Sequence, residues 1–194
     1  MNTDDLWSQL SQARWSTITK HPTPFSGKVY AASLPSPWGR CFIALAEESL
    51  CQLAFWDQDS EREQYQDQLH RDWPQADLIY NTHHVQNFLQ QSATQQQGTL
   101  LLQGSPFQVL VWQTLLAVPF GHRLCYQELA SALGQTSACR AVASAVAKNK
   151  IAYLIPCHRI VRKQGDTGNY RWGKQRKQAL LNWESTLNAK PDFF

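Results

Sequence analysis

The sequence predicts a mixed α/β (α+β) protein of two domains, covering residues 1–100 and 101–194. Three short runs rich in β-forming residues, KVYAASL, GRCFIALA and SLCQLAFW, follow one another between residues 28 and 56, with turn residues between them, which is typical of an antiparallel meander. Helical segments come next, and two short helical stretches on either side of Gly134 have helix-turn-helix spacing. The Gln-rich segment 92–98 separates the two regions and is expected to be a linker.

The charge of the chain changes sign near the same place. Residues 1–100 contain 6 Lys or Arg against 11 Asp or Glu, whereas residues 101–194 contain 12 against 4. Ten of these basic residues lie between Arg140 and Lys177, where Asp166 is the single acid. This density suits contacts to phosphates, and a solvated basic face without a partner is the plainer alternative.

Composition indicates a globular protein of a reducing compartment. Of 194 residues 43% are hydrophobic and eight are Trp, enough for a substantial core. No run approaches the roughly 18 apolar residues of a membrane span, and the start, MNTDDLWSQLSQARW, has acids where a signal peptide carries bases, so we expect a cytoplasmic protein. The five cysteines form an odd set without close pairs, which argues against disulfides and zinc, and we expect no metal and no cofactor.

In chain order, the first 25 residues are expected to form a helix or an arm, and helices are expected at 60–73 and 83–91 after the meander. Residues 99–104 have the pattern of a strand and 105–118 that of a helix, with Ser105 as N-cap and Pro106 at the first helical position. The helix pair covers 126–149. Residues 151–155, IAYLI, are expected to form a buried strand that ends at Pro156, because proline cannot donate to a sheet.

The second helix of the pair carries mostly small side chains. Arg140 is nearly the only long side chain before Lys148 in the stretch SACRAVASAVAK. A helix face made of small side chains can approach a nucleic-acid groove closely. Ordinary helix packing through alanine is the commoner explanation of such a pattern.

Cys157 lies where the predicted strand ends, in the stretch LIPCHRIV. A thiolate is the reactive form of cysteine, and an imidazole is the usual device for producing one. His158 is adjacent in sequence, so in an extended backbone its ring would point away from the thiol and the link would need a turn or a water. A buried, inert cysteine is the general alternative, and it fits the other four cysteines, which are set in apolar patterns.

These residues resemble the O6-alkylguanine-DNA alkyltransferases, a family of direct-reversal DNA repair proteins. The motifs that carry the resemblance run in order from Ser105 to Glu184: PFQVLVW, VPFG, YQELA, CRAVASAVAKN, IPCHRIV, TGNYRWG and LLNWE. The first half matches mainly by architecture. The resemblance implies a ribonuclease-H-like structural domain at 1–100 and a mainly helical, winged-helix-like catalytic domain at 101–194.

For the chemistry, the resemblance implies irreversible transfer of a methyl or other alkyl group from O6-alkylguanine in duplex DNA to Cys157, once per protein molecule. His158 would act as base through a water, and Glu184 would orient and stabilise the imidazole. Asn149 would tie the helix pair to the active site. Activity on O4-methylthymine stays open.

For binding, the resemblance implies a monomer that approaches double-stranded DNA through the minor groove and flips the damaged nucleotide out of the stack. Arg140 would enter the stack, Tyr126 would turn the phosphate and donate a hydrogen bond to the base, and Tyr170 would wall the pocket. The carbonyls of Cys157 and Ile160 would accept from the guanine amino group. The residues expected to face DNA are Ala138, Ala141, Ser144 and Arg159.

Two stretches depart from the family pattern, NKIAYL and NYRWG. The bulky Trp172 is expected to narrow the pocket, so that methyl adducts are repaired better than benzyl adducts. The alternatives are a non-catalytic winged-helix DNA-binding protein, which leaves the Pro-Cys-His-Arg motif and Glu184 unexplained, and a cysteine hydrolase, which leaves the basic, alanine-rich helix unexplained.

Overall fold

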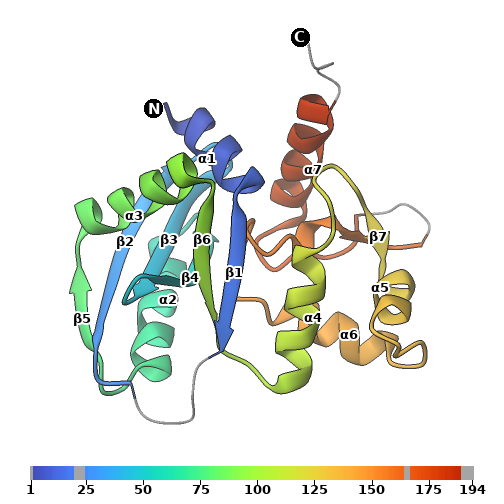
Figure 1. Cartoon of the computed structure of the whole chain (residues 1–194), viewed down its shortest axis with the longest axis horizontal. Coiled ribbons are helices and arrows are strands. Elements are labelled where there is room, and N and C mark those ends of the chain that lie inside the picture. The colour runs from blue at the N-terminus through green and yellow to red at the C-terminus, as the bar shows by residue number, and fades with distance from the viewer. Residues whose placement is uncertain (1, 20–24, 164–166, 189–194) are drawn as a thin grey trace. The chain divides into compact units, whose positions relative to one another are not determined.

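The computed structural model describes residues 2–19, 25–163 and 167–188, and its chain divides into two units (Figure 1). The first unit contains residues 1–103 together with 150–152, and the second contains 104–149 and 153–194. We expected a single division after residue 100. The division falls three residues later, and Lys150–Ala152 join the first unit although both of their chain neighbours belong to the second.

The first unit is built on a six-stranded mixed sheet with the strand order β1-β6-β4-β3-β2-β5. The strands β2, β3 and β4 form the expected antiparallel meander, while β1, β5 and β6 join it through parallel pairs. The bounds of the elements are β1 Arg14–Thr19, β2 Lys28–Ser36, β3 Gly39–Ala46, β4 Ser49–Trp56, β5 Asp77–Tyr80, β6 Gln97–Leu102, α1 Thr3–Gln12, α2 Asp59–Asp72 and α3 Thr82–Gln95.

Helices cover both faces of this sheet. On one face Leu69 at the end of α2 and Trp73 just beyond it pack against Val29, Phe42 and other side chains of β2 and β3. On the opposite face Tyr30 of β2 stacks on His84 of α3. All eight residues of β4 are buried, as expected for a strand with helices on both sides.

Two expectations for the first unit need correction. The first 25 residues form more than a helix or an arm, because β1 follows α1 and pairs with β6; residues 20–24 lie outside the described residues. The Gln-rich segment 92–98 is not a linker. Helix α3 continues to Gln95, Gln96 caps it in the left-handed conformation, and β6 begins at Gln97. Burial of Ser92 and Ala93 on α3 supplies the stabilisation that local composition does not indicate.

The second unit is mainly helical. Ser105 caps the helix after it and Pro106 occupies the first turn, as expected. The helix pair also forms as expected, with Gly134 at a positive φ of 66° in the turn between its helices. A short parallel pair joins β7 to β8. The bounds are α4 Pro106–Leu116, β7 Leu124–Cys125, α5 Tyr126–Ala132, α6 Cys139–Ala147, a 3₁₀ turn at Cys157–Arg159, β8 Ile160–Val161 and α7 Lys174–Asn188.

Residues 151–155 do not form the expected strand. They are all buried, but they run through turns, with Tyr153 at a φ of 65°, and Ile151 makes one isolated parallel bridge to Leu53 of β4. The apolar run therefore reflects burial of an irregular segment, which periodicity alone cannot distinguish from a strand.

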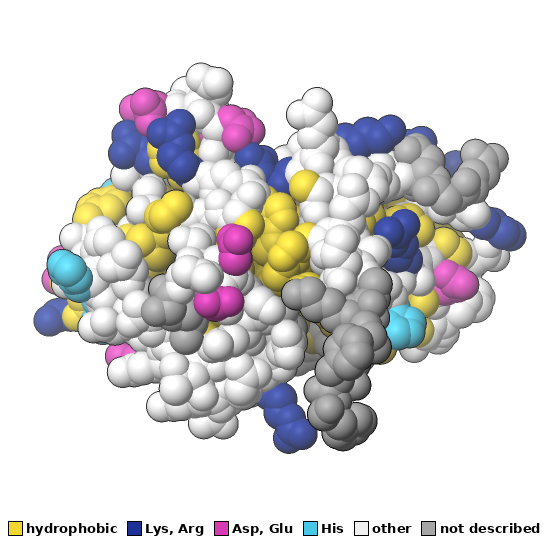
Figure 2. Space-filling view, turned by 90° about the horizontal axis from the view of Figure 1, so that it is seen from above, with side chains coloured by type: hydrophobic (Ala, Val, Ile, Leu, Met, Phe, Trp, Pro, Cys, Tyr) yellow, Lys and Arg dark blue, Asp and Glu magenta, His cyan; other side chains and the backbone are white. Residues whose placement is uncertain are grey.

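The surface of the described residues exposes few large apolar side chains, namely Ile18, Tyr80 and Leu110. On the face in Figure 2, apolar side chains are interrupted by polar atoms, and both signs of charge are present. Within the described ranges no helix is long and apolar enough to cross a membrane.

Candidate active site

Cys157 begins a 3₁₀ turn directly after Pro156, and only 5% of it is exposed. The side-chain amide of Asn149 donates to its sulfur, with an Nδ2–Sγ distance of 3.2 Å, and also to the carbonyl of Ile155 at 3.2 Å. One asparagine thus holds both the thiol and the turn that leads to it. Asn149 is 1% exposed, so these bonds are shielded from water.

Burial raises the pKa of the Cys157 thiol above its ordinary value. The hydrogen bond from Asn149 and the positive charges of Lys177 and Arg171 lower this pKa, but they do not cancel the cost of burying a thiolate. At neutral pH the sulfur is therefore protonated at rest, and nucleophilic chemistry at this position needs a base.

His158, the residue after Cys157, is buried beside Glu184. Its Nε2 lies 2.7 Å from Oε1 of Glu184, and burial lowers the pKa of the imidazole despite the opposing effect of the carboxylate. The ring is therefore neutral at pH 7, so Nε2 carries the proton that it donates to Glu184, and Nδ1 has a free lone pair. Nδ1 is buried and bonds to no protein atom within the described residues. The contact with Glu184 thus fixes the tautomer of the buried imidazole.

Glu184 on α7 accepts from three groups. Besides His158, it accepts from the guanidinium of Arg159, with Nε and Nη2 at 3.1 and 3.0 Å from Oε1, and from the backbone N–H of Gly121 at 3.1 Å. Burial favours the protonated carboxyl, but the hydrogen bonds and charges of His158 and Arg159 outweigh it and lower the pKa of Glu184. The carboxylate is therefore ionised and fixed in orientation.

Arg159 does not have the position that we expected for a DNA contact. The residue is 7% exposed, and its guanidinium binds Glu184 and donates to the carbonyl of Val118 at 2.6 Å. The buried carboxylate attracts the guanidinium inward because a bidentate ion pair offsets the cost of removing both charges from water. Arg159 thus orients Glu184 and is not presented to a phosphate.

Lys177 is a site residue that the sequence reasoning did not single out. It is 1% exposed, and its Nζ donates to the carbonyl of Ile160 at 2.5 Å. The signal was present, since Lys177, Leu180, Leu181 and Glu184 have the i, i+3, i+4, i+7 spacing of the buried face of a helix. The carbonyl of Ile160 retains a second lone pair for another donor.

A cavity of about 470 Å³ opens onto Cys157. Burial, followed by the charge of Cys157, raises the pKa of both Tyr126 and Tyr170, and that of Tyr170 well above its ordinary value, so both hydroxyls keep their protons at neutral pH. The residues lining the cavity are Tyr126, Ala143, Val146, Ala147, Cys157, Asn169, Tyr170 and Arg171.

Trp172 is not among the lining residues. It is 4% exposed and packs edge-on against Tyr170, with ring centroids 5.2 Å apart. The expected narrowing by Trp172 is therefore wrong. The preceding residue, Arg171, lines the cavity instead and donates to the backbone carbonyl of Asn149 at 3.2 Å.

The helix α6 presents the predicted small surface. Arg140, Ala141 and Ser144 are exposed and Ala138 is partly exposed, while Val142, Ala145 and Val146 face inward. The indole of Trp112 on α4 donates to the carbonyl of Ala145 at 2.9 Å, which fixes α6 against α4.

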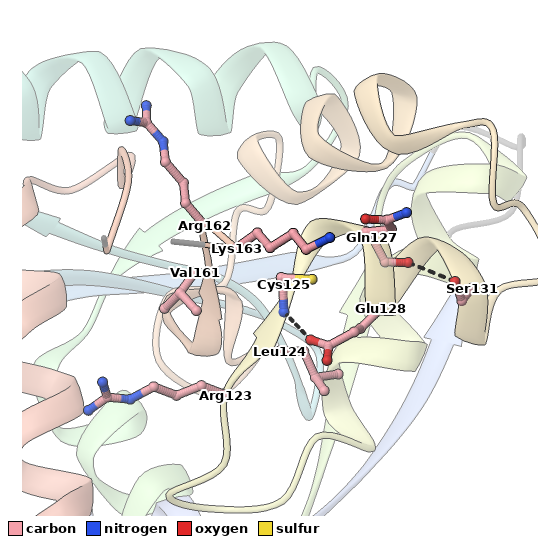
Figure 3. Close-up of a pocket in the computed structure, with 9 residues that line it drawn as sticks. All are labelled: Arg123, Leu124, Cys125, Gln127, Glu128, Ser131, Val161, Arg162 and Lys163. Carbon is pink, nitrogen blue, oxygen red and sulfur yellow. Dashed lines mark hydrogen bonds between the residues drawn. The ribbon is translucent and has the colours of Figure 1, made fainter. Parts of the chain in front are cut away.

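A second, more open cavity of about 690 Å³ lies where β7, α5 and the residues after β8 meet. Figure 3 shows Lys163 extended toward Gln127, above Cys125, whose backbone N–H donates to Glu128. Arg123 and Arg162 also line this cavity, so it carries three exposed cations. Among the described side chains, no group of three or more His, Cys, Asp or Glu residues is arranged to hold a metal ion.

Residues 106–186 match the family described as 6-O-methylguanine DNA methyltransferase, DNA binding domain. The chain is 41% identical over 151 residues to the bifunctional transcriptional activator/DNA repair enzyme Ada of Escherichia coli (strain K12), covering 76% of this chain and 43% of that protein. It is 44% identical over 86 residues to the methylated-DNA--protein-cysteine methyltransferase of Kluyveromyces lactis, covering 44% of this chain and 46% of that one. The chain thus spans less than half the length of these two relatives.

The fold is similar to the crystal structure of Mycobacterium tuberculosis OGT in complex with DNA, with a TM-score of 0.62 and 27% identity over 81% of this chain and 93% of that one. The family match runs from residue 106 in α4 to residue 186 in α7, and every side chain of the site described above lies within this range. Residues 106–186 thus carry the similarity to the 6-O-methylguanine DNA methyltransferase family, in the DNA binding domain that this family model describes.

Proposed function

We propose that this protein repairs DNA by direct reversal, taking the methyl or other alkyl group of O6-alkylguanine onto its own Cys157 as a methylated-DNA--protein-cysteine methyltransferase. The observation that carries the proposal is the arrangement at Cys157. The sulfur borders a cavity, receives a hydrogen bond from Asn149, and is adjacent in sequence to a neutral imidazole that Glu184 orients.

The reaction is a displacement at the alkyl carbon. Nδ1 of His158 takes the proton of the thiol through a water, which removes the need for the two adjacent side chains to touch. The thiolate then forms a bond to the alkyl carbon while the carbon–O6 bond breaks, and the electron pair of that bond stays on guanine. A thioether at Cys157 has no proton to lose and resists hydrolysis, so each protein molecule reacts once.

Lys177 and Asn149 stabilise the thiolate while it exists. Lys177 contributes a buried positive charge, and Asn149 contributes a directed N–H donor. Tyr126 remains protonated and can donate to the base as guanine leaves, and Tyr170 walls the cavity. The carbonyls of Cys157 and Ile160 would accept from the guanine amino group.

For DNA recognition we place α6 in the minor groove of the duplex. That groove is only about 6 Å wide, so the small exposed residues of α6 suit it, and its degenerate hydrogen-bond pattern suits a protein that meets damage in any sequence. Arg140 would enter the stack as the damaged nucleotide flips out. Arg123, Arg162 and Lys163 (Figure 3) would contact phosphates in the role first expected of Arg159.

The proposal includes the finer features expected of the family. The first unit would be a ribonuclease-H-like structural domain, the second a winged-helix-like catalytic domain, and the active species a monomer. The parallel β7–β8 pair beside α5 and α6 is consistent with a wing.

The deciding experiment incubates the protein with a duplex that contains tritiated O6-methylguanine. We expect label to reach the protein to at most one methyl group per chain, and to be found on the peptide that contains Cys157. Cys157→Ala should bind the duplex and accept no label. Cys139→Ala is the matched control, since Cys139 is a partly exposed thiol of the same unit outside the cavity, and it should accept label normally.

Two outcomes contradict the proposal. Label on Cys157→Ala would show that another residue is the acceptor. Tight binding of the duplex by the wild-type protein without any transfer would favour the alternative, a non-catalytic winged-helix DNA-binding protein.

A further inference from the structure

Residues Lys150–Ala152 lie between Asn149 and Tyr153 in the chain, yet they pair with β4 of the first unit. The N–H of Leu53 donates to the carbonyl of Lys150 at 3.0 Å, and the N–H of Ala152 donates to the carbonyl of Leu53 at 2.7 Å. These two bonds form the isolated bridge between Leu53 and Ile151. The segment Lys150–Ala152 is thus held to Leu53 of β4 by two backbone hydrogen bonds in a parallel arrangement.

An ion pair strengthens the same attachment. Nζ of Lys150 lies 2.6 Å from Oδ2 of Asp72, with side chains that are 26% and 15% exposed. Asp72 is the last residue of α2, and its other oxygen accepts from Gln68 at 2.9 Å. Because the pair is short, mostly shielded from water and oriented at both oxygens of the carboxylate, it constrains position more than an ordinary surface ion pair does.

Asn149, directly before Lys150, is the residue whose position matters for the thiol. Its Nδ2 donates to Cys157 and Ile155, and its own carbonyl accepts from Arg171. The Nδ2–Sγ distance of 3.2 Å depends on where the backbone of Asn149 lies. Only one peptide bond separates that backbone from the residue that Asp72 binds.

We propose that the Asp72–Lys150 ion pair and the Leu53–Ile151 bridge are positioning elements of the active site, which hold the backbone of Asn149 where its amide reaches the sulfur of Cys157. The inference deepens the proposed function and rests on the same thiol. The two anchoring residues, Asp72 and Leu53, are not among the residues that line the cavity.

The test is the pH dependence of Cys157 reactivity without DNA. Iodoacetamide alkylates thiolates, and mass spectrometry of peptides resolves Cys157 from the other four cysteines. Besides Asn149, the groups that act on the thiol or line its cavity are Tyr126, Tyr170, Arg171 and Lys177, and none of these four changes in the variants below.

We expect Asp72→Asn to raise the midpoint of the Cys157 profile by about half a pH unit, which leaves about threefold less thiolate below the midpoint. Lys150→Met should act in the same direction. Combining Asp72→Lys with Lys150→Asp restores an ion pair and should return the midpoint at least halfway to the wild-type value. Asp59→Asn is the matched control, because it breaks the exposed ion pair to Arg62 on the same helix and should leave the midpoint unchanged.

A double-mutant cycle separates positioning from general stabilisation. In an Asn149→Ala background the donor is gone, so Asp72→Asn should shift the midpoint no further. Equal midpoints for wild type, Asp72→Asn and Lys150→Met would overturn the proposal, as would an undiminished shift in the Asn149→Ala background. The alkylation needs no DNA, so this result is independent of whether the protein accepts methyl groups from O6-methylguanine.

Discussion

Three charged side chains, Arg159, Lys177 and Glu184, are buried close to Cys157, and each has a different task. Glu184 orients His158, Arg159 fixes Glu184, and Lys177 supplies a positive charge near the thiol. Buried charges are costly unless they are paired and hydrogen-bonded. Here the buried charges act on two groups that the proposed displacement uses. Glu184 orients the neutral imidazole of His158, and Lys177 lowers the free energy needed to form the thiolate of Cys157.

Lys177→Met tests the buried positive charge. The substitution keeps most of the side-chain volume and removes the charge that lowers the pKa of Cys157. We expect the rate of methyl transfer at pH 7.5 to fall about tenfold, which corresponds to a thiol pKa about one unit higher. Single-turnover kinetics over a range of pH values measures both. Lys174→Met, an exposed change in the same helix, should leave the profile in place.

Glu184→Gln should destabilise the protein as well as slow transfer. Removing the carboxylate leaves the guanidinium of Arg159 buried without its counter-ion, which we expect to cost about 3 kcal/mol of unfolding free energy. Urea denaturation followed by tryptophan fluorescence gives the value. Adding Arg159→Met should recover part of the loss, and a double variant no more stable than Glu184→Gln would count against this account.

The stability of the fold should decrease as the pH falls below about 6.5. Burial lowers the pKa of His158 in the folded protein. Near pH 6.5 the unfolded chain therefore binds a proton at this residue while the folded protein does not, and the unfolding free energy decreases as the pH falls through this range. Glu184, whose folded-state pKa is also lowered, loses its contribution at still lower pH. The unfolding free energy measured between pH 7.5 and 5 should fall, and His158→Asn should flatten that dependence.

At the scale of elements, α6 combines a buried apolar stripe with an exposed face of mostly small side chains. Val142, Ala145 and Val146 face inward, and Trp112 holds the helix through the carbonyl of Ala145. The exposed alanines therefore are not needed to pack this helix against α4. This arrangement favours a role in groove binding over the alternative of ordinary helix packing through alanine.

Ala141→Leu tests that role. Because Ala141 is exposed, the change should alter the unfolding free energy by less than about 0.5 kcal/mol. A bulky side chain on the groove-facing surface should nevertheless weaken duplex binding about tenfold, measured by fluorescence anisotropy. Ala132→Leu, at an exposed position of α5, is the control. Equal affinities for the two variants would show that α6 does not enter the groove.

Arg140→Ala should separate binding from base flipping. We expect transfer from a duplex to slow at least tenfold and transfer from a single strand to change little, because only the duplex has a stack to open. Rapid-quench measurements on the two substrates give the ratio. An equal decrease on both would assign Arg140 to general phosphate binding.

At the scale of the whole molecule, the two halves of the chain have opposite charge. The formal net charge is +3, and the basic residues concentrate in the second half, where Arg123, Arg162 and Lys163 line an open cavity. Binding that depends on such residues releases counter-ions from DNA and weakens with salt.

Salt titrations of duplex binding should reveal these phosphate contacts. Arg162→Gln and Lys163→Gln should each reduce the slope of log affinity against log salt by about 1, with little effect on the single-turnover rate at saturating protein. Arg159→Gln should leave the salt slope unchanged because its guanidinium is buried against Glu184. A lower slope for Arg159→Gln would restore the original expectation for that residue.

The local features of the second unit could be predicted because they depend on short-range patterns. The cap at Ser105, the turn at Gly134 and the Pro-Cys-His-Arg motif each need only neighbouring residues to specify them. In the first unit the meander was predictable from the alternation of strands and turns. The strand β6 was predicted in part, at 99–104, but β1 and its parallel pairing with β6 were not, since β1 lacks a strong pattern and pairs with a segment more than eighty residues away.

The sequence by itself was enough to predict the family resemblance and to single out Cys157 and its neighbours as the candidate site, because these depend on residue type and spacing. Only the tertiary structure decided which cations are buried and which are exposed: Arg159 and Lys177 lie inside, whereas Arg162 and Lys163 lie at the surface. It also decided that residues 150–152 belong to the first unit. Burial and pairing depend on which distant groups come together, and a carboxylate such as Glu184 or Asp72 can draw a cation to a place that local sequence does not specify.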